Sequence, residues 1–347
     1  MNENSVAVSG AKTETNATRK WSPPGPLAGP RQLSAAEVEN LVSLTDRVTA
    51  DPATGPNWVC HQARLASRRL DDALVSDLLA FRDWGSNSGA MVIQGAPVGL
   101  LPATPVDNTA GVARLTQLAR SALLVASVLG DPLAYQAEGH GHLIQDMVPS
   151  RRLAYTQQSQ GSRVELELHT EQAFSQHRPD WVVLACLRGD PDAATFLFTV
   201  RQLTRQLTGD ERIALRQARW TTTIDESFKP FVPRPDEVRG PMPILSGPAW
   251  DPTIVFDQDL TRGLDPEAEY LRKKVIELYL EHRTAYVLRP GDILVVDNSR
   301  AVHGRSAFSP RFDGADRFIA RLMAVRDLAT VRDALAPDGR TISAHFS

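Results

Sequence analysis

The chain has 347 residues, of which 42% are hydrophobic and 23% charged, the balance of an ordinary globular protein. Its formal net charge of −3 gives no reason to expect nucleic acid or an anionic membrane as a partner. The sequence has no apolar run near the roughly 20 residues that a membrane helix needs, and its N-terminus lacks the apolar segment of a signal peptide. We therefore expect a cytoplasmic protein in which Cys60 and Cys186 are buried thiols rather than a disulfide.

The first third of the chain is predicted to be mostly helical. Residues 1–32 are rich in Asn, Thr, Ser, Gly and Pro, and this composition predicts a disordered tail. Ser34 and Glu37 have the spacing of a capping box, which predicts a helix that begins there and ends near Thr49. The next predicted elements are a helix at 58–83, a strand at 89–94 and a helix at 108–129.

Short strands separated by Pro and Gly dominate the chain from about residue 133. We expect them near residues 133–136, 142–148, 163–170, 181–187, 193–199, 219–225, 243–246, 252–257, 285–288, 292–297 and 317–326. Two helical patterns interrupt them, at 201–217 and 266–282. No polar linker separates the two parts, so we expect one domain over 33–347, helical at 33–130 and an antiparallel sandwich or barrel at 131–330.

Residues 164–171 alternate between apolar and polar side chains, which is the pattern of a half-buried strand. His169 and Glu171 are two residues apart, so on a strand they point to the same face. His303 follows an apolar strand and a turn, and it could provide a third ligand. Two histidines and one carboxylate with other positions open form the metal site of non-haem Fe(II) oxygenases.

Each of these residues also has a simpler interpretation. Two further glutamates share the polar face with His169, so this face could simply be solvated. His303 could be an ordinary loop histidine. His140 and His142 form a rival pair of ligands, although no carboxylate accompanies them at that spacing.

Two other features indicate a binding site. Arg317 and Arg321 fall on one face of a predicted strand, and arginine is the favoured partner of carboxylates. A solvated face is the alternative for this pair. The long, Pro-interrupted loop at about 225–240 contains Phe228 and Phe231, and its length is more typical of an active-site lid than of an idle surface excursion.

Four blocks of sequence, in this order, resemble the clavaminate synthase-like Fe(II)/2-oxoglutarate oxygenases. They are His169–Phe174, His177–Asp180, Asp297–Arg305 and Arg311–Arg317. This group includes bacterial asparagine oxygenase and the arginine and lysine hydroxylases of peptide-antibiotic pathways. The resemblance extends over about residues 133–327. It implies a mainly β fold with flanking helices, built on a distorted double-stranded β-helix, or jelly roll.

The resemblance also implies roles for individual residues. His169, Glu171 and His303 would bind iron, and Glu171 would also face the α-amino group of the substrate. Arg317 would bind the distal carboxylate of 2-oxoglutarate, assisted by Thr195. The other implied contacts are to the amino-acid substrate: Arg321 and Ser159 for its α-carboxylate, Gln136 or Glu138 for its α-amino group, and Asp257 and Asp259 for its side chain.

The implied activity is hydroxylation of an unactivated C–H bond, at Cβ or Cγ of a free L-amino acid, in specialised-metabolite biosynthesis. Asp257 and Asp259 favour a basic side chain, arginine ahead of lysine, unless they only form a polar turn. Asparagine as substrate, or desaturation or cyclisation at the same iron, are alternatives. Outside this class, a non-catalytic jelly-roll binding protein and a zinc hydrolase stay open. Fe(II), 2-oxoglutarate and O2 would be required, and the oligomeric state is left open.

Overall fold

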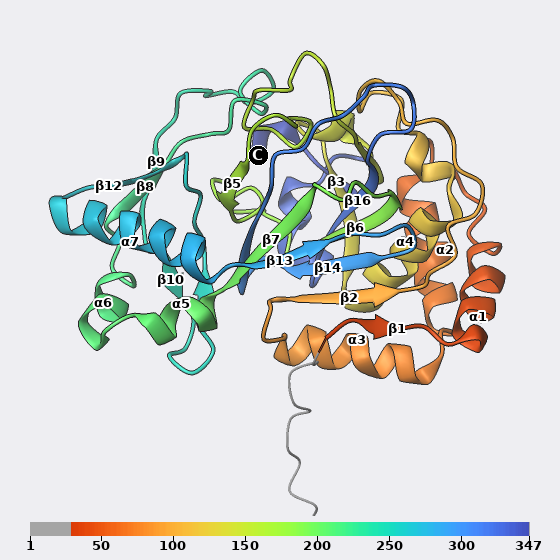
Figure 1. Cartoon of the computed structure of the whole chain (residues 1–347), viewed down its shortest axis with the longest axis horizontal. Coiled ribbons are helices and arrows are strands. Elements are labelled where there is room, and N and C mark those ends of the chain that lie inside the picture. Colours follow the sequence, from red (N-terminus) through yellow and green to blue (C-terminus); the bar gives the residue numbers. More distant parts are fainter. Residues whose placement is uncertain (1–28, 347) are drawn as a thin grey trace, which may run out of the picture.

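The N-terminal part of the protein forms a layer of helices beneath and beside a large sheet (Figure 1). The structure is a computed structural model that describes residues 29–346. The predicted tail at 1–32 lies mostly outside the described residues. Its last part does not fit that prediction, because Arg31–Gln32 form strand β1, which pairs in parallel with β2 (Ala90–Gln94).

The first helix, α1 (Ala35–Thr45), has the predicted capping box. The Ser34 side chain accepts a hydrogen bond from the backbone N–H of Glu37, and the Glu37 side chain accepts one from the N–H of Ser34. The prediction of one helix over 58–83 is wrong, since the chain forms α2 (Pro56–Ser67) and α3 (Asp72–Trp84). Asp71 caps the second of these, accepting a hydrogen bond of 2.9 Å from the N–H of Ala73.

Helix α4 (Gln117–Leu129) begins later than predicted, because Thr116 caps it and a short 3-10 helix, η1 (Val112–Leu115), precedes it. Ten of its residues are buried, and it packs on strands of the large sheet. It is therefore the inner helix of the layer. Among residues 29–346, no helix combines the length and the apolar character that crossing a bilayer requires.

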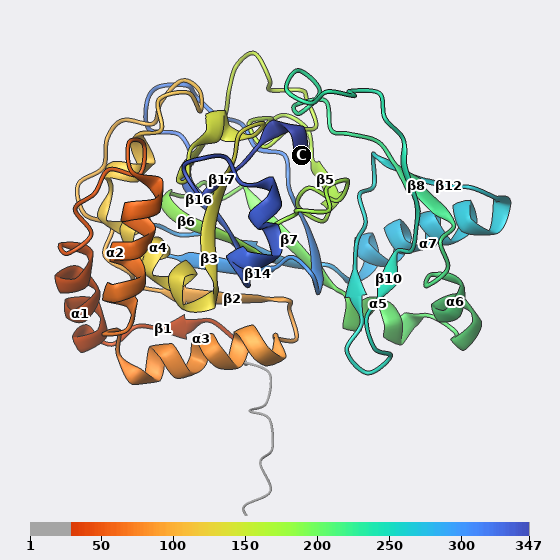
Figure 2. The ribbon, with the colours of Figure 1, turned by 180° about the vertical axis from the view of Figure 1, so that it is seen from behind.

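The large sheet has the strand order β1-β2-β14-β6-β16-β3-β17, with β4 also paired to β16. Figure 2 shows β16, β3 and β17 from behind. The members not yet given are β3 (Asp131–Tyr135), β4 (Gln145–Met147), β6 (Trp181–Arg188), β14 (Ile293–Asp297), β16 (Phe318–Val325) and β17 (Thr341–Ile342). A second sheet has the order β13-β7-β15-β5, formed by β5 (Leu166–His169), β7 (Ala194–Thr199), β13 (Thr284–Val287) and β15 (Ala301–Arg305).

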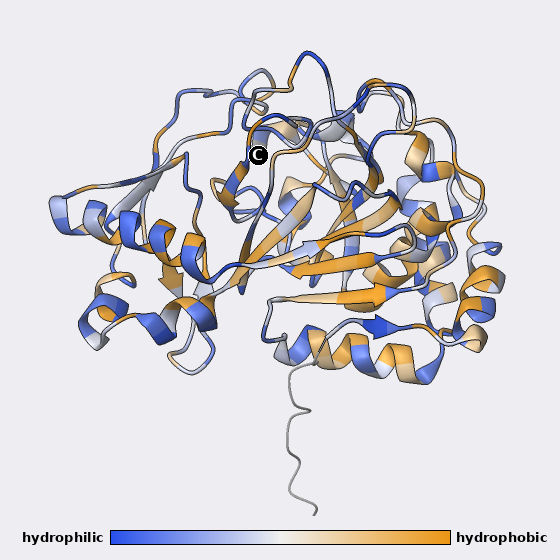
Figure 3. Cartoon of the chain, viewed as in Figure 1, coloured by the Kyte–Doolittle hydropathy of each residue, from blue (hydrophilic) through white to orange (hydrophobic). Residues whose placement is uncertain are grey.

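The central strands of the large sheet are strongly hydrophobic, as the orange colour of β2 and β14 in Figure 3 shows. Their side chains point alternately into two apolar clusters, one on each face of the sheet. On β6, Val183 and Ala185 pack against the helices, whereas Val182 and Leu184 belong to the cluster between the sheets. Ile319 on β16 and Leu197 on β7 join this second cluster. Ile319 and Arg321 therefore point into the space between the two sheets, whereas Met323 on the same face packs with Leu133 and Tyr135 of β3.

A smaller lobe lies beside the second sheet, at the left of Figure 1. Its helices are α5 (Val200–Gln206), α6 (Gly209–Ala214) and α7 (Pro266–His282), and α7 has the predicted bounds. Its strands are β8 (Trp220–Thr222), β9 (Arg239–Met242), β10 (Leu245–Ser246), β11 (Thr253–Ile254) and β12 (Thr261–Gly263). The remaining 3-10 helices are η2 (Gly139–Gly141), η3 (Leu328–Ala334) and η4 (Ala344–Phe346). The result is a sheet-rich fold with flanking helices, as predicted.

The capping box gives a prediction about stability. Ser34→Ala removes the acceptor for the Glu37 N–H and is expected to lower the free energy of unfolding by about 1 kcal/mol. Urea denaturation followed by circular dichroism measures this change. Ser246→Ala, at an exposed position of β10, is the control and is expected to leave the unfolding midpoint unchanged. Equal midpoints for both variants would contradict the capping role.

Candidate active site

Two histidines face each other across neighbouring strands. Strand β15 pairs antiparallel with β5, and its register places His303 directly opposite His169. The predicted turn follows β14, at residues 298–300. The alternative of an ordinary loop histidine is wrong, because His303 lies in the middle of β15, all five residues of which are buried. Strand β15 lies between β7 and β5, so its burial depends on segments distant in the sequence.

Glu171 completes a compact cluster with these histidines. The potential ligand atoms of His169, Glu171 and His303 all lie within 4.8 Å of one another. The two imidazole rings are 4.3 Å apart between centroids, and His303 Nε2 is 3.7 Å from Glu171 Oε2. His169 Nδ1 lies 2.7 Å from the carbonyl oxygen of Glu167, which leaves its Nε2 for a ligand.

The protonation states of this cluster suit a divalent metal. Burial would raise the pKa of Glu171, but Arg321 and His303 more than offset this effect and hold the pKa of that carboxyl well below its usual range. Burial and the adjacent His169 lower the pKa of His303, so its ring is neutral. His303 Nδ1 is also buried without a hydrogen-bond partner. An anionic carboxylate beside a neutral imidazole fits iron.

The rival pair of histidines has no such arrangement. The rings of His140 and His142 are 6.3 Å apart. His140 Nε2 lies 3.0 Å from Asn108 Oδ1, and His142 Nε2 lies 3.2 Å from the carbonyl oxygen of Thr109. Within residues 29–346, only the cluster at 169, 171 and 303 meets the spacing of a three-ligand site.

The three-residue cluster lies in a cavity of about 440 Å³. The cavity brings together most of the residues singled out in the sequence, namely Glu138, Ser159, His169, Glu171, Thr195, Phe228, Phe231, Asp257, Asp259, His303, Arg317 and Arg321. Gln136 is not among them, since its side chain is exposed and accepts a hydrogen bond from the N–H of Ala344. Of the two alternatives at this point, Glu138 is the one that reaches the cavity.

One end of the cavity is strongly cationic. Arg317 is 6% exposed, and in the described part of the chain it has no carboxylate partner. Arg305 is 5% exposed, and burial together with Arg317 lowers the pKa of its guanidinium to about 9. Both guanidinium groups lie near the Phe308 ring, at 6.0 and 5.0 Å from its centroid. Thr195 pairs with Arg305 across β7 and β15. Such uncompensated charge favours an anionic ligand.

Arg321, in contrast, is part of a buried network with carboxylates. Its Nη1 donates to Glu171 Oε1 at 3.1 Å, and its Nη2 donates to Glu138. Its Nε donates to Gln145 Oε1 at 2.9 Å. Arg321 is only 4% exposed, so the solvated alternative for this arginine is wrong. The carboxylate of Glu171, a candidate metal ligand, is thus hydrogen-bonded directly to Arg321 on β16 of the large sheet.

The two aspartates differ in their surroundings. The backbone of Asp257 forms an isolated antiparallel β-bridge with that of His169. The Asp257 Oδ1 accepts hydrogen bonds from the N–H groups of Asp259 (2.9 Å) and Leu260 (2.8 Å). Asp257 therefore forms the polar turn and also faces the cavity. Burial raises the pKa of Asp257 to about 6, an effect that His169 opposes and Asp225 reinforces. Asp259 is exposed at the cavity edge.

The predicted lid lies over the cavity and is held by one of its two aromatic residues. Phe228 is 4% exposed and packs edge-to-face on Phe174, with ring centroids 4.9 Å apart. Phe231 is 51% exposed, although it too lines the cavity. Asp225, at the start of this loop, is a further acidic lining residue. The loop is therefore anchored at Phe228 and also at Val232, which belongs to the same apolar cluster, whereas Phe231 is exposed between them.

Known proteins support this reading of the site. The taurine catabolism dioxygenase family TauD/TfdA matches residues 73–323. An L-lysine 3-hydroxylase from Catenulispora acidiphila is 49% identical over 321 residues, which cover 91% of this chain and 89% of that protein. An L-asparagine oxygenase from Streptomyces coelicolor is 34% identical over 90% of this chain and 93% of its own length.

The chain belongs to the TauD/TfdA dioxygenase family.

Solved structures agree with this assignment. Asparagine oxygenase in complex with Fe(II), 3-hydroxyasparagine and succinate matches with a TM-score of 0.84 at 31% identity, covering 90% of this chain and 99% of that one. The non-heme iron oxygenase OrfP with Fe and alpha-ketoglutaric acid matches with a TM-score of 0.79 at 26% identity. The match covers 91% of this chain and 100% of that one. The predicted class of this TauD/TfdA member, an Fe(II)/2-oxoglutarate-dependent dioxygenase, is confirmed.

Four residues of the site were not singled out in the sequence. Arg305 and Asn298 belong to the Asp297–Arg305 block, but only His303 had a recognisable function there. Gln145 lies on the short strand β4, and Asp225 begins the lid. Both were within predicted elements, yet no sequence pattern distinguished them from neighbouring polar residues.

The metal cluster of this TauD/TfdA dioxygenase gives a direct prediction. His303→Ala is expected to abolish Fe(II) binding at equimolar metal, because two remaining ligands hold the ion far more weakly. Anaerobic gel filtration followed by metal analysis measures the bound iron. His142→Ala, in the rival pair, is the control and is expected to bind iron as the unaltered protein does. Loss of iron in His142→Ala and not in His303→Ala would instead assign the metal site to the rival pair of histidines.

Proposed function

We propose that this dioxygenase hydroxylates Cβ or Cγ of a free L-amino acid with a cationic side chain, using Fe(II), 2-oxoglutarate and O2. The observation that carries the proposal is the presence, in one cavity, of a three-ligand cluster and a buried arginine without a carboxylate partner. The two sheets that enclose this cavity are best described as a distorted double-stranded β-helix. We place the enzyme in specialised-metabolite biosynthesis.

The metal would be bound by His169, Glu171 and His303. Three protein ligands leave positions open for a chelating co-substrate and for O2, and the bound iron would supply the oxidising chemistry. The contribution of the protein is to hold His169 on β5, His303 on β15 and Glu171 just beyond β5 at the short distances described above, and to shield them from water.

The distal carboxylate of 2-oxoglutarate would bind at the cationic end of the cavity. Arg317 has the free charge that such a carboxylate needs, and a guanidinium can bind it through two parallel hydrogen bonds. Thr195 offers a hydroxyl on the neighbouring strand. Arg305 adds a second positive charge nearby. A zinc hydrolase or a non-catalytic binding protein would not need this buried pair of arginines.

The α-carboxylate and α-amino groups of the substrate would bind on the other side of the cluster. Arg321 is the cation for the carboxylate, with Ser159 as a further contact. Glu138 and Glu171 are the anions for the amino group. When Glu171 serves as a metal ligand, the Arg321 donor that it now occupies becomes available for the substrate.

Several carboxylates around the cavity favour a cationic side chain. Asp225 reinforces the raised pKa of Asp257, and Asp259 contributes to the raised pKa of Glu167 after burial. Neighbouring carboxylates disfavour one another's ionisation and together create a negative potential. This potential attracts an ammonium or guanidinium group. The loop with Phe228 and Phe231 would close over this end of the substrate.

Lysine is the first choice among basic amino acids. The expectation of arginine ahead of lysine came from the acidic residues alone, and these fit both side chains. The 49% identity with an L-lysine 3-hydroxylase over 91% of the chain favours lysine. An L-ornithine/L-arginine 3-hydroxylase is only 30% identical, over 83% of this chain. Arginine and asparagine, and desaturation or cyclisation at the same site, are the other outcomes.

A panel of the twenty free amino acids tests the proposed function. Each is incubated with the enzyme, Fe(II), 2-oxoglutarate and O2, and succinate and product mass are measured. We expect lysine to give succinate together with a product heavier by one oxygen atom. Turnover of asparagine alone would overturn the cationic specificity, and an absence of succinate with every amino acid would overturn the free-substrate proposal.

The co-substrate site gives a second prediction. Arg317→Met is expected to raise the KM for 2-oxoglutarate by roughly 30-fold or more, since losing one partner of a buried charge pair costs about 2 kcal/mol or more. Iron binding should change little. Arg311→Met is the matched control, because Arg311 is exposed and does not line the cavity. An unchanged KM in Arg317→Met would remove this arginine from the co-substrate site.

The substrate side-chain site gives a third prediction. Asp257→Asn keeps the Oδ1 acceptor of the turn but removes the charge, so kcat/KM for lysine is expected to fall by roughly tenfold relative to a neutral analogue. Asp338→Asn is the matched control. Asp338 Oδ1 accepts from two N–H groups in the same way, both at 2.9 Å, but it is exposed and outside the cavity. Equal selectivity in both variants would exclude Asp257 from substrate binding.

A further inference from the structure

We propose that Asn298 is the positioning residue that holds Glu171 in place relative to His303. This inference rests on the proposed metal site, and it assigns a function to a residue that is not one of the three candidate ligands and does not line the cavity. Asn298 lies in the turn between β14 and β15, five residues before His303, and it is fully buried. Asn298 is therefore close to His303 in the chain and hydrogen-bonded to Glu171.

A single side chain satisfies both backbone groups of Glu171. Asn298 Oδ1 accepts a hydrogen bond of 2.8 Å from the Glu171 N–H, and Asn298 Nδ2 donates one of 3.1 Å to the Glu171 carbonyl oxygen. Nδ2 also donates to the carbonyl oxygen of Pro179 at 2.7 Å. Every strong hydrogen-bonding position of this amide, except one acceptor lone pair, is in use.

Glu171 needs such a partner because it lies beyond the end of its strand. Strand β5 ends at His169, and within residues 29–346 Glu171 makes no backbone–backbone hydrogen bond. Its neighbour Thr170 is held by the Phe256 carbonyl oxygen at 2.7 Å. The position of the Glu171 backbone, and hence of its carboxylate, thus depends on Asn298 more than on the sheet.

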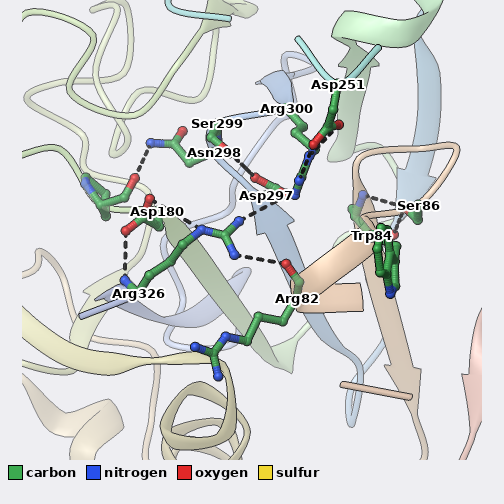
Figure 4. A network of polar contacts seen from close by, with 12 residues as sticks. Arg82, Trp84, Ser86, Asp180, Asp251, Asp297, Asn298, Ser299, Arg300 and Arg326 are labelled. Carbon is green, nitrogen blue, oxygen red and sulfur yellow. Dashed lines mark hydrogen bonds and ion pairs between the residues drawn. The ribbon is translucent and has the colours of Figure 1, made fainter. Parts of the chain in front are cut away.

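The turn that carries Asn298 is itself fixed from outside, as Figure 4 shows. Asp297 is fully buried and accepts hydrogen bonds from Arg300 Nη1 (2.8 Å) and Ser299 Oγ (2.6 Å). Arg300 also donates to Asp251 at 2.7 Å. The backbone N–H of Asn298 donates to the Asp180 carbonyl oxygen at 2.9 Å. Because these bonds hold the turn in place, the Asn298 amide can fix the position of the Glu171 backbone.

This arrangement explains how two ligands from distant parts of the chain keep one geometry. Glu171 and Asn298 are 127 residues apart in sequence. Partners outside the ligand set fix the orientation of metal ligands, and their loss weakens metal binding by roughly tenfold to hundredfold. Asn298 acts on the backbone of the ligand rather than on its carboxylate. Its loss should therefore change ligand geometry as well as affinity.

The test measures Co(II) binding to the full chain, without turnover. Asn298→Ala and Asn298→Asp are expected to raise the Kd for Co(II) roughly tenfold or more and to change the visible absorption of the Co(II)-saturated protein. Asn298→Asp has the same size and keeps the acceptor oxygen, but it lacks the amide donor, so it stays informative if Asn298→Ala does not fold. Metal-free thermal stability is recorded for each variant.

Two controls separate positioning from stability. Asn40→Asp alters another amide, which donates to the Arg69 carbonyl oxygen at 3.1 Å in the helical layer. Ser34→Ala weakens the fold through a helix cap. Both should keep the affinity for Co(II) and its spectrum, even where stability falls. An Asn298 variant that behaves as these controls do would overturn the inference. Failure of the unaltered protein to bind Co(II) would instead count against the metal site itself.

Discussion

The pairing of β5 with β15 is the contact on which the site depends. It places His303 opposite His169, and the turn before β15 supplies the amide that bonds Glu171. The large sheet with its helical layer holds β14, which leads into this turn. The apolar cluster between the sheets then fixes the distance between β15 and β16, the strand that carries Arg321. The helices that form so much of the chain thus contribute by keeping the large sheet rigid.

Charge is distributed unevenly within the cavity, and this distribution separates its ligands. Among residues 29–346, the arginines at 305 and 317 form no ion pair with a carboxylate, whereas Arg321 is surrounded by Glu138, Glu171 and Gln145. We propose that a dicarboxylate binds at the first pair. A zwitterionic amino acid suits the second group, which offers both signs of charge. The acidic lid and turn residues extend this pattern to the substrate side chain. We propose that one cavity binds a dicarboxylate and an amino acid in different places because the surrounding charges differ.

Local signals in the sequence predicted those parts of the structure that depend on near neighbours. The capping box at Ser34, the helix Pro266–His282 and the alternation around His169 are all of this kind. Strand β15 could not be found in this way, because Gly304 and two polar residues give it no clear pattern and its burial comes from β5 and β7. The function of Asn298 depends on a contact across 127 residues. Likewise, only the folded chain distinguishes Glu138, which faces the cavity, from Gln136, which does not.

We propose that one cavity binds Fe(II) through three protein ligands, with 2-oxoglutarate beside the metal. Anaerobic titration of the metal-free protein with Fe(II) and then with 2-oxoglutarate, followed by visible absorption, tests it directly. We expect a weak charge-transfer band that appears only when both are present and saturates at one equivalent of each. A protein that binds Fe(II) but gives no band with 2-oxoglutarate would show that the two do not bind together in this cavity.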